Sequence, residues 1–124
     1  MPFTNFDQVQ VDNGNADVPQ LISAAGAISQ RSGLVIITAG SAIALTLAAP
    51  TAGAVNVGGD DGKVLTIQSN TAFAHTITNS TPGFNAGGAV SDVATFSAAI
   101  GNNLVLRAYN GRWLVQSSVG ATLA

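Results

Sequence analysis

The only histidine, His75, is the residue around which acid–base or nucleophilic catalysis would have to be built. A serine hydrolase needs a histidine that is oriented by a carboxylate, and Asp60, Asp61 or Asp92 would have to supply it. No serine stands in the Gly-x-Ser-x-Gly pattern that exposes a nucleophile on a sharp turn. A histidine beside two threonines on a strand is more typical of a packed, hydrogen-bonded residue. We therefore predict no catalytic residue in this chain.

Two neighbouring aspartates, Asp60 and Asp61, stand between glycines and raise the question of a cation site. Paired carboxylates can bind Mg²⁺ or Ca²⁺. An Asp-Gly pair before a strand is also a common turn, because Asp hydrogen-bonds its own backbone and Gly accepts a positive φ. Residues 12–17 lack the oxygen spacing of an EF-hand loop, and the Gly-rich run before Lys63 lacks the ending of a phosphate-binding loop. The turn is the favoured interpretation and a metal site the alternative, and no cofactor is predicted.

The strongest structural signal is a β-hairpin over residues 104–117, centred on Asn110-Gly111. Asn-Gly accepts the positive φ at both corners of a type I′ turn, so Tyr109 should face Arg112. Alternate residues then share a face. One face is expected in the core, which makes packing the favoured role of its tryptophan over sugar binding: Leu104, Leu106, Ala108, Trp113 and Val115. The other face mixes apolar, aromatic and Arg side chains, as protein contacts do, and its predicted interface residues are Val105, Arg107, Tyr109, Arg112 and Leu114.

Short β-branched segments between turn residues indicate further strands at residues 33–38, 41–47, 63–68, 73–78 and 93–96. The first is apolar on both faces, so we expect it to be covered on both sides, and Ala39-Gly40 predicts a hairpin with the second. Residues 17–26 fit either a two-turn helix capped by Asp17 or an extended lead-in. About six to eight short strands and no long helix predict an all-β fold, an antiparallel β-sandwich or a small β-barrel.

Charged residues make up 8% of the 124 residues, against about 25% in an ordinary domain. Four basic residues are too few to follow a phosphate backbone, which argues against nucleic-acid binding. The chain has no cysteine, hence no disulfide or thiolate metal site, and no apolar stretch reaches the ~20 residues of a membrane span. Scarce surface charge suits a subunit that works inside an assembly. We expect residues 1–16 to be an extended arm and residues 17–124 a single β domain.

Four segments, in this order, resemble small structural proteins of tailed bacteriophages and prophages, in particular capsid decoration (cement) proteins. The segments are GLVIITAGSAIALTLAAP at 33–50, DDGKVLTI at 60–67, AHTIT at 74–78 and AYNGRW at 108–113. The likeness covers about residues 26–118 and rests on the order of the segments and their Ala, Gly and Thr content.

The resemblance implies a homotrimer on the outer surface of the icosahedral head of the virion, which clamps neighbouring major capsid proteins and has no active site. It also implies an arm that lies across a neighbouring subunit. A tail-fibre or baseplate receptor-binding module is the first alternative, because it shares the β-rich trimer. A small β-fold hydrolase is the second, and it requires His75 and an aspartate to converge in a pocket.

Overall fold

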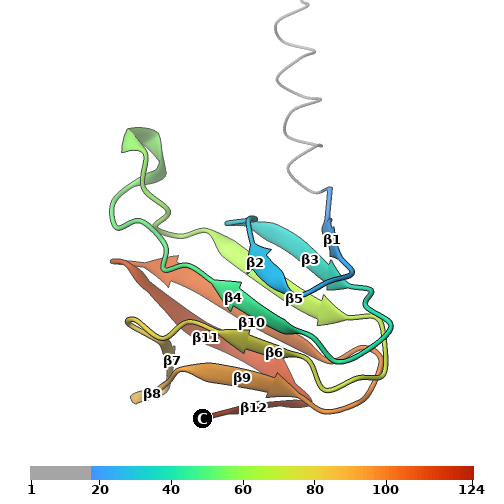
Figure 1. The fold of residues 1–124 in the computed structure, drawn as a ribbon. Helices are drawn as coiled ribbons and strands as arrows, with labels where there is room; N and C mark the ends of the chain where they lie inside the picture. Colours follow the sequence, from blue (N-terminus) through green and yellow to red (C-terminus); the bar gives the residue numbers. More distant parts are fainter. Residues whose placement is uncertain (1–17) are drawn as a thin grey trace, which may run out of the picture.

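The computed structural model describes residues 18–124, which form two β-sheets packed face to face (Figure 1). The seven-stranded sheet has the order β1(Gln20–Ile22), β3(Gly33–Ile37), β5(Val64–Ser69), β10(Asn103–Tyr109), β11(Arg112–Val119), β7(Phe84–Ala86) and β8(Ala89–Ser91). The five-stranded sheet has the order β12(Ala121–Leu123), β9(Val93–Phe96), β6(Thr76–Thr78), β4(Ala44–Leu47) and β2(Gly26–Ile28). The all-β sandwich class is confirmed. The predicted arm, residues 1–16, lies outside the described residues.

The first half of the described chain crosses repeatedly between the two sheets. β1, β3 and β5 pair in parallel in one sheet, and β2, β4 and β6 pair in parallel in the other. The predicted hairpin between residues 33–38 and 41–47 is therefore wrong. The large apolar side chains of these segments face one another across the core instead of lying side by side in one sheet. Both sheets are consequently mixed, not wholly antiparallel, because β-strands that alternate between two layers can stack in parallel.

Residues 17–26 contain no helix within their described part. The segment forms the extended strand β1 and the start of β2, as the alternative interpretation expected. Ile22 is buried here and pairs with Ile37, so the segment contributes to the core as a strand. Several three-residue strands, among them β7, β8 and β12, lie outside the strands that the sequence predicted.

The second half of the chain is built on the predicted hairpin, and its register is confirmed. Tyr109 pairs with Arg112 and Ala108 with Trp113. Asn110 has a φ of 53° and Gly111 a φ of 78°, as a type I′ turn requires. Beyond a β-bulge between Val105 and Leu106, the pairing shifts by one residue, because β11 carries one extra residue there.

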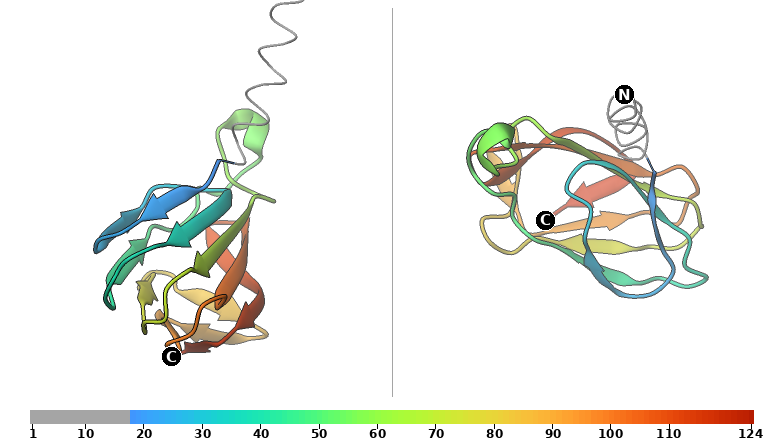
Figure 2. Two further views of the ribbon diagram at one scale, coloured as in Figure 1. Left: turned by 90° about the vertical axis from the view of Figure 1, so that its right-hand side faces the viewer. Right: turned by 90° about the horizontal axis from the view of Figure 1, so that it is seen from above.

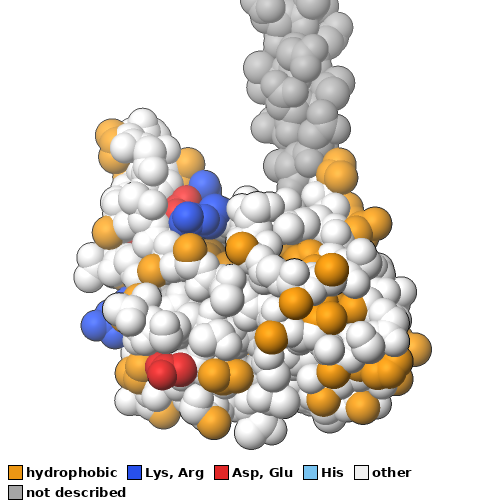
Figure 3. Space-filling view, in the orientation of Figure 1, with side chains coloured by type: hydrophobic (Ala, Val, Ile, Leu, Met, Phe, Trp, Pro, Cys, Tyr) orange, Lys and Arg blue, Asp and Glu red, His pale blue; other side chains and the backbone are white. Residues whose placement is uncertain are grey.

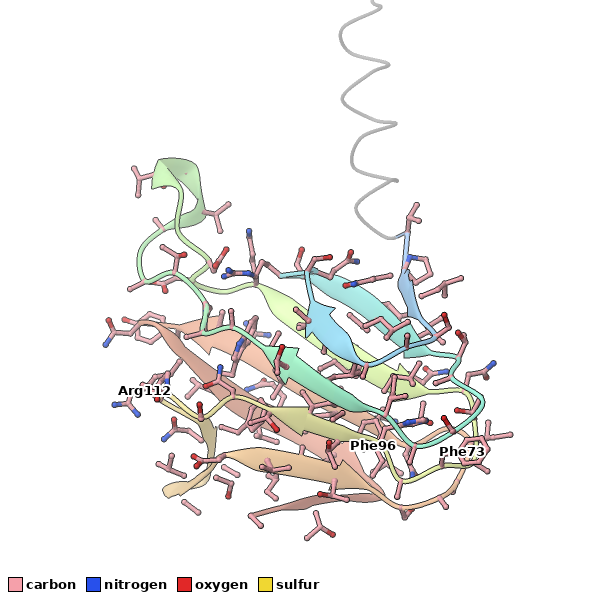
Figure 4. The ribbon with its side chains drawn as sticks, in the orientation of Figure 1. Phe73, Phe96 and Arg112 are labelled. Carbon is pink, nitrogen blue, oxygen red and sulfur yellow. The ribbon has the colours of Figure 1, made fainter. Side chains whose placement is uncertain are left out.

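The core between the sheets consists of aliphatic residues around three large rings, Trp113, Phe84 and Phe96. Trp113 is fully buried, and its indole Nε1–H donates to the carbonyl of Ala48 at 2.9 Å. Its place in the core, predicted from the hairpin register, is confirmed. In Figure 4 Phe96 lies inside the sandwich, whereas Phe73 and Arg112 lie at its opposite ends. Phe73, the first residue of the predicted strand 73–78, is partly exposed, because β6 begins only at Thr76.

A loop, residues 51–62, projects from one end of the sandwich and carries the short 3₁₀ helix η1(Val55–Val57) (Figures 1 and 2). Backbone hydrogen bonds from Asp60 N to Thr51 O and from Asp61 N to Gly53 O join the two ends of the loop. A Cβ atom built on Gly59 would overlap the backbone of Gly53. The loop is thus close-packed, because its two ends are hydrogen-bonded and in direct backbone contact. No helix long and apolar enough to cross a membrane occurs within residues 18–124.

Candidate contact surface

The outer face of the seven-stranded sheet carries all five predicted interface residues. Strand register places them in adjacent rows: Val105 lies next to Thr66, and Arg107 lies between Val64 and Leu114. Val105 and Leu114 are half-buried, whereas Arg107, Tyr109 and Arg112 are exposed. The structure therefore brings these residues together on one face, opposite the core. Whether this face is an interface stays a prediction.

The same face extends beyond the hairpin, over residues that the sequence analysis did not assign to it. Leu34 and Ile36 of β3 and Val64 of β5 are half-buried and point away from the core. Leu21 of β1, paired with Ile36, is 64% exposed. β3 was expected to be covered on both sides, but no described element covers this side. The sequence of β3 is apolar at successive positions, so its outward-facing side chains are apolar as well as its buried ones.

An open hollow of about 470 Å³ lies on this face, lined by Gly33, Leu34, Val64 and Thr66. Gly33 pairs with Leu65 in the register and contributes only backbone to the hollow. Leu34 and Val64 supply apolar walls, and Thr66 supplies the only side-chain hydroxyl. The hollow can receive one apolar side chain from a partner.

The charge on this face is cationic. Its charged side chains are Arg107 and Arg112. Neither takes part in the two ion pairs within the described residues, because Asp60 forms both of them with other cations. Arg112 Nη1 reaches Asn85 Oδ1 at 3.4 Å, a long contact between two exposed groups. Two guanidinium groups beside an apolar surface favour a partner that is both apolar and acidic.

The outer face of the five-stranded sheet differs in chemistry. Its exposed and half-buried positions are short and mostly hydroxylated: Ala44, Thr46, Thr76, Thr78, Val93, Thr95 and Thr122. Figure 3 views the molecule from the side of this sheet, where few charged side chains are visible and they lie toward the periphery. Threonine hydroxyls form hydrogen bonds with water, so such a face is solvated without a protein partner. The seven-stranded sheet therefore offers the better contact surface.

His75 is buried in the core and has a structural role there. Its Nδ1 accepts a hydrogen bond from the backbone N–H of Ile43 at 3.3 Å, and its Nε2 lies 2.9 Å from the hydroxyl of Thr71. An accepting Nδ1 implies the neutral ring with the proton on Nε2. Desolvation by burial lowers the pKa of His75 below its ordinary value of 6.5. Neither ring nitrogen contacts an aspartate of residues 18–124, so this part of the chain does not assemble the His–Asp pair that a hydrolase needs.

Asp60 is a buried carboxylate that joins the projecting loop to the sandwich. Its Oδ1 accepts from Lys63 Nζ at 2.9 Å, and its Oδ2 accepts from Thr51 N at 2.7 Å and Arg31 Nη1 at 3.1 Å. The hydrogen bond from Lys63 is the largest cause that lowers the pKa of Asp60, followed by the one from Thr51. Asp61 accepts a hydrogen bond from the backbone N–H of Asn110 at 2.8 Å. The pair therefore ties the loop to the sandwich and to the hairpin turn.

Within residues 18–124 no group of three His, Cys, Asp or Glu side chains is arranged to hold a metal ion. The predicted acidic segment 12–17 lies outside the described residues.

Comparison with protein-family models finds no match, and comparison with curated proteins finds none. The resemblance to phage decoration proteins accordingly stays a prediction from the four sequence segments.

Proposed function

We propose that this protein is a non-enzymatic decoration (cement) protein of a tailed-phage head, which forms trimers on the outer surface and clamps neighbouring major capsid proteins. The single observation that carries the proposal is the outer face of the seven-stranded sheet, which no element within residues 18–124 covers, with its apolar side chains, its hollow and its two arginines. Isolated exposed apolar residues are normal on a protein surface, whereas a contiguous apolar patch marks a contact site.

The roles of the two most reactive candidates support a structural protein. His75 uses both ring nitrogens inside the core, and Asp60 uses both carboxylate oxygens to hold a loop. Residues that are fully occupied in packing stabilise the fold and leave the surface to do the binding.

The mechanism is repetition of modest contacts. A face of this kind contributes through burial of apolar area at about 25 cal/mol per Å² and through its two arginines. A trimer presents three such faces at once, so the attachment of one raises the effective concentration of the others. Resistance of the head to internal pressure then comes from the sum of many identical clamps.

The test uses purified protein and phage heads that lack their decoration protein. We expect the protein to co-sediment with these heads and to raise the temperature at which they release DNA. Val105→Asp places a carboxylate in the middle of the proposed contact face and should abolish co-sedimentation. Thr95→Asp, on the outer face of the five-stranded sheet, is the matched control and should bind as the unmodified protein does.

Failure of the unmodified protein to bind any such heads, together with a strictly monomeric mass at high concentration, would contradict the proposal. Equal loss of binding in both variants would also count against the seven-stranded sheet as the contact face, provided that both retain their folded circular-dichroism spectrum.

A further inference from the structure

The described domain and the segment that precedes it differ sharply in charge. All four basic residues of the chain lie within residues 18–124, with three of the six aspartates. The other three, Asp7, Asp12 and Asp17, lie within residues 1–17, which contain no Lys or Arg. The same 17 residues also contain apolar side chains, among them Phe3 and Phe6. They therefore have the composition, apolar and acidic, that the outer face of the seven-stranded sheet favours in a partner.

The described chain also begins beside that face. It joins the domain at Val18, two residues before β1, and β1 is the edge strand of the seven-stranded sheet next to β3. Strands lie about 4.8 Å apart, so the hollow between β3 and β5 is about 7 Å from β1 and Arg107 on β10 about 15 Å from it. An extended chain covers up to about 3.3 Å per residue. Phe6 lies twelve positions before Val18, a stretch that can span up to about 40 Å, which is ample for both positions.

We propose that residues 1–17 cover the outer face of their own seven-stranded sheet, with a phenylalanine side chain in the hollow lined by Leu34 and Val64 and with aspartates facing Arg107 and Arg112. Attachment to the same chain gives the segment an effective concentration in the millimolar range, so a weak contact is sufficient to hold it. Any partner that uses this face must first displace the segment. The inference does not depend on the proposed function, because its test requires the protein alone.

The chain has no cysteine, so the substitution Thr4→Cys creates a unique site for a nitroxide spin label. The label broadens the NMR signals of backbone amides that it approaches. In full-length, ¹⁵N-labelled protein we expect a loss of amide signal at Leu34, Thr66 and Val105, and much less at Thr95 on the opposite sheet. Reduction of the nitroxide should restore the signals.

Two full-length variants test the chemistry of the contact. Arg107→Gln combined with Arg112→Gln removes the cations, and Phe3→Ser combined with Phe6→Ser removes the apolar anchors without touching the domain. Each should relieve the broadening, as should raising the salt concentration, since exposed charges are screened. Asp92→Asn is the matched control for a charge change outside the face and should leave the broadening unchanged.

Equal broadening of both sheets, or none, would overturn the proposal, and so would broadening that neither double variant relieves. A mixture of spin-labelled ¹⁴N protein and unlabelled ¹⁵N protein separates the two possible sources of the segment. Broadening in that mixture would show that the segment covers a neighbouring copy, which would overturn the assignment to its own chain.

Discussion

Asp60 shows how one carboxylate can fix the position of a whole loop. The side chain is buried, yet each of its oxygens has a donor, and two of the three donors come from outside its own turn: Arg31 lies on the β2–β3 connection and Thr51 at the start of the loop. Burying a charge is costly unless it is paired and hydrogen-bonded. The Arg31 guanidinium also donates to the carbonyl of Ala49, so the network extends to the other end of the loop.

Asp60→Asn should destabilise the protein by about 2 kcal/mol, because hydrogen bonds to a charged group contribute about 1.5–3 kcal/mol. The substitution also replaces one accepting oxygen with an NH₂ group, which cannot accept the hydrogen bond from its donor. Arg31 is 38% exposed at its side chain and therefore adds little to this loss. Urea denaturation at pH 7 measures the change. Asp92→Asn, an exposed site without an ion pair in the described chain, should change stability by less than about 0.5 kcal/mol. Equal effects of the two substitutions would contradict the proposed role of Asp60.

His75 makes stability depend on pH. Burial lowers its pKa below 6.5 in the folded protein, so the unfolded chain binds the proton first as the solution is acidified. The free energy of unfolding should therefore be highest above about pH 6.5 and fall as the pH drops below that value. Carboxylates with ordinary pKa values near 4 stay ionised in this range.

His75→Gln should remove this dependence, because His75 is the only histidine of the chain. Urea denaturation at pH 7.5, 6.5 and 5.5 gives the comparison. The same fall in stability in both proteins would show that another group is responsible.

At the scale of single elements, the local pattern of the strands was sufficient to orient their side chains. Leu65 and Ile67 of β5, like Leu45 and Leu47 of β4, stand at alternate positions of their strands and point into the core. The projecting loop was predictable as a Gly-rich connection but not as a close-packed structure. Its packing depends on contacts between its two arms, which no short window of sequence contains.

Gly59→Ala should destabilise the protein by about 1–3 kcal/mol, because its Cβ would overlap the backbone of Gly53 and force the loop arms apart. Gly40→Ala is the matched control, since a Cβ atom there meets nothing within 4 Å and the glycine has no positive φ. Thermal unfolding of both variants measures the difference. A shift of the melting temperature in Gly40→Ala as large as in Gly59→Ala would contradict this account of the loop.

At the scale of the whole molecule, the two outer faces of the sandwich have separate chemistry. The five-stranded sheet presents short hydroxylated side chains, and the seven-stranded sheet presents larger apolar residues with two arginines. The two outer faces therefore differ both in polarity and in charge.

The proposed trimer should have three times the chain mass of 12.3 kDa, measured by light scattering during size-exclusion chromatography. Apolar contacts between copies should make the trimer resistant to moderate salt, because burial of apolar area is not screened by ions. A mass equal to one chain over the whole accessible concentration range would contradict the trimer.

Much of this protein was already determined by residues that are close together in sequence. The all-β class, the turn at Asn110-Gly111, the register of Tyr109 with Arg112, and the burial of Trp113 all follow from φ preferences and period-two alternation over a few positions. The structural role of Asp60 and Asp61 in a turn was favoured on the same local grounds.

Only the tertiary structure decided which sheet each strand joins and what lies between the strands. Val35 pairs with Ile67, 32 positions along the chain, and the hollow needs Leu34 of β3 and Thr66 of β5 side by side. Such pairings depend on how two layers pack and on the closure of long loops, whereas alternation specifies only which side chains point the same way. For that reason the sequence could predict the faces of the strands, while the parallel stacking and the shape of the contact surface required the folded chain.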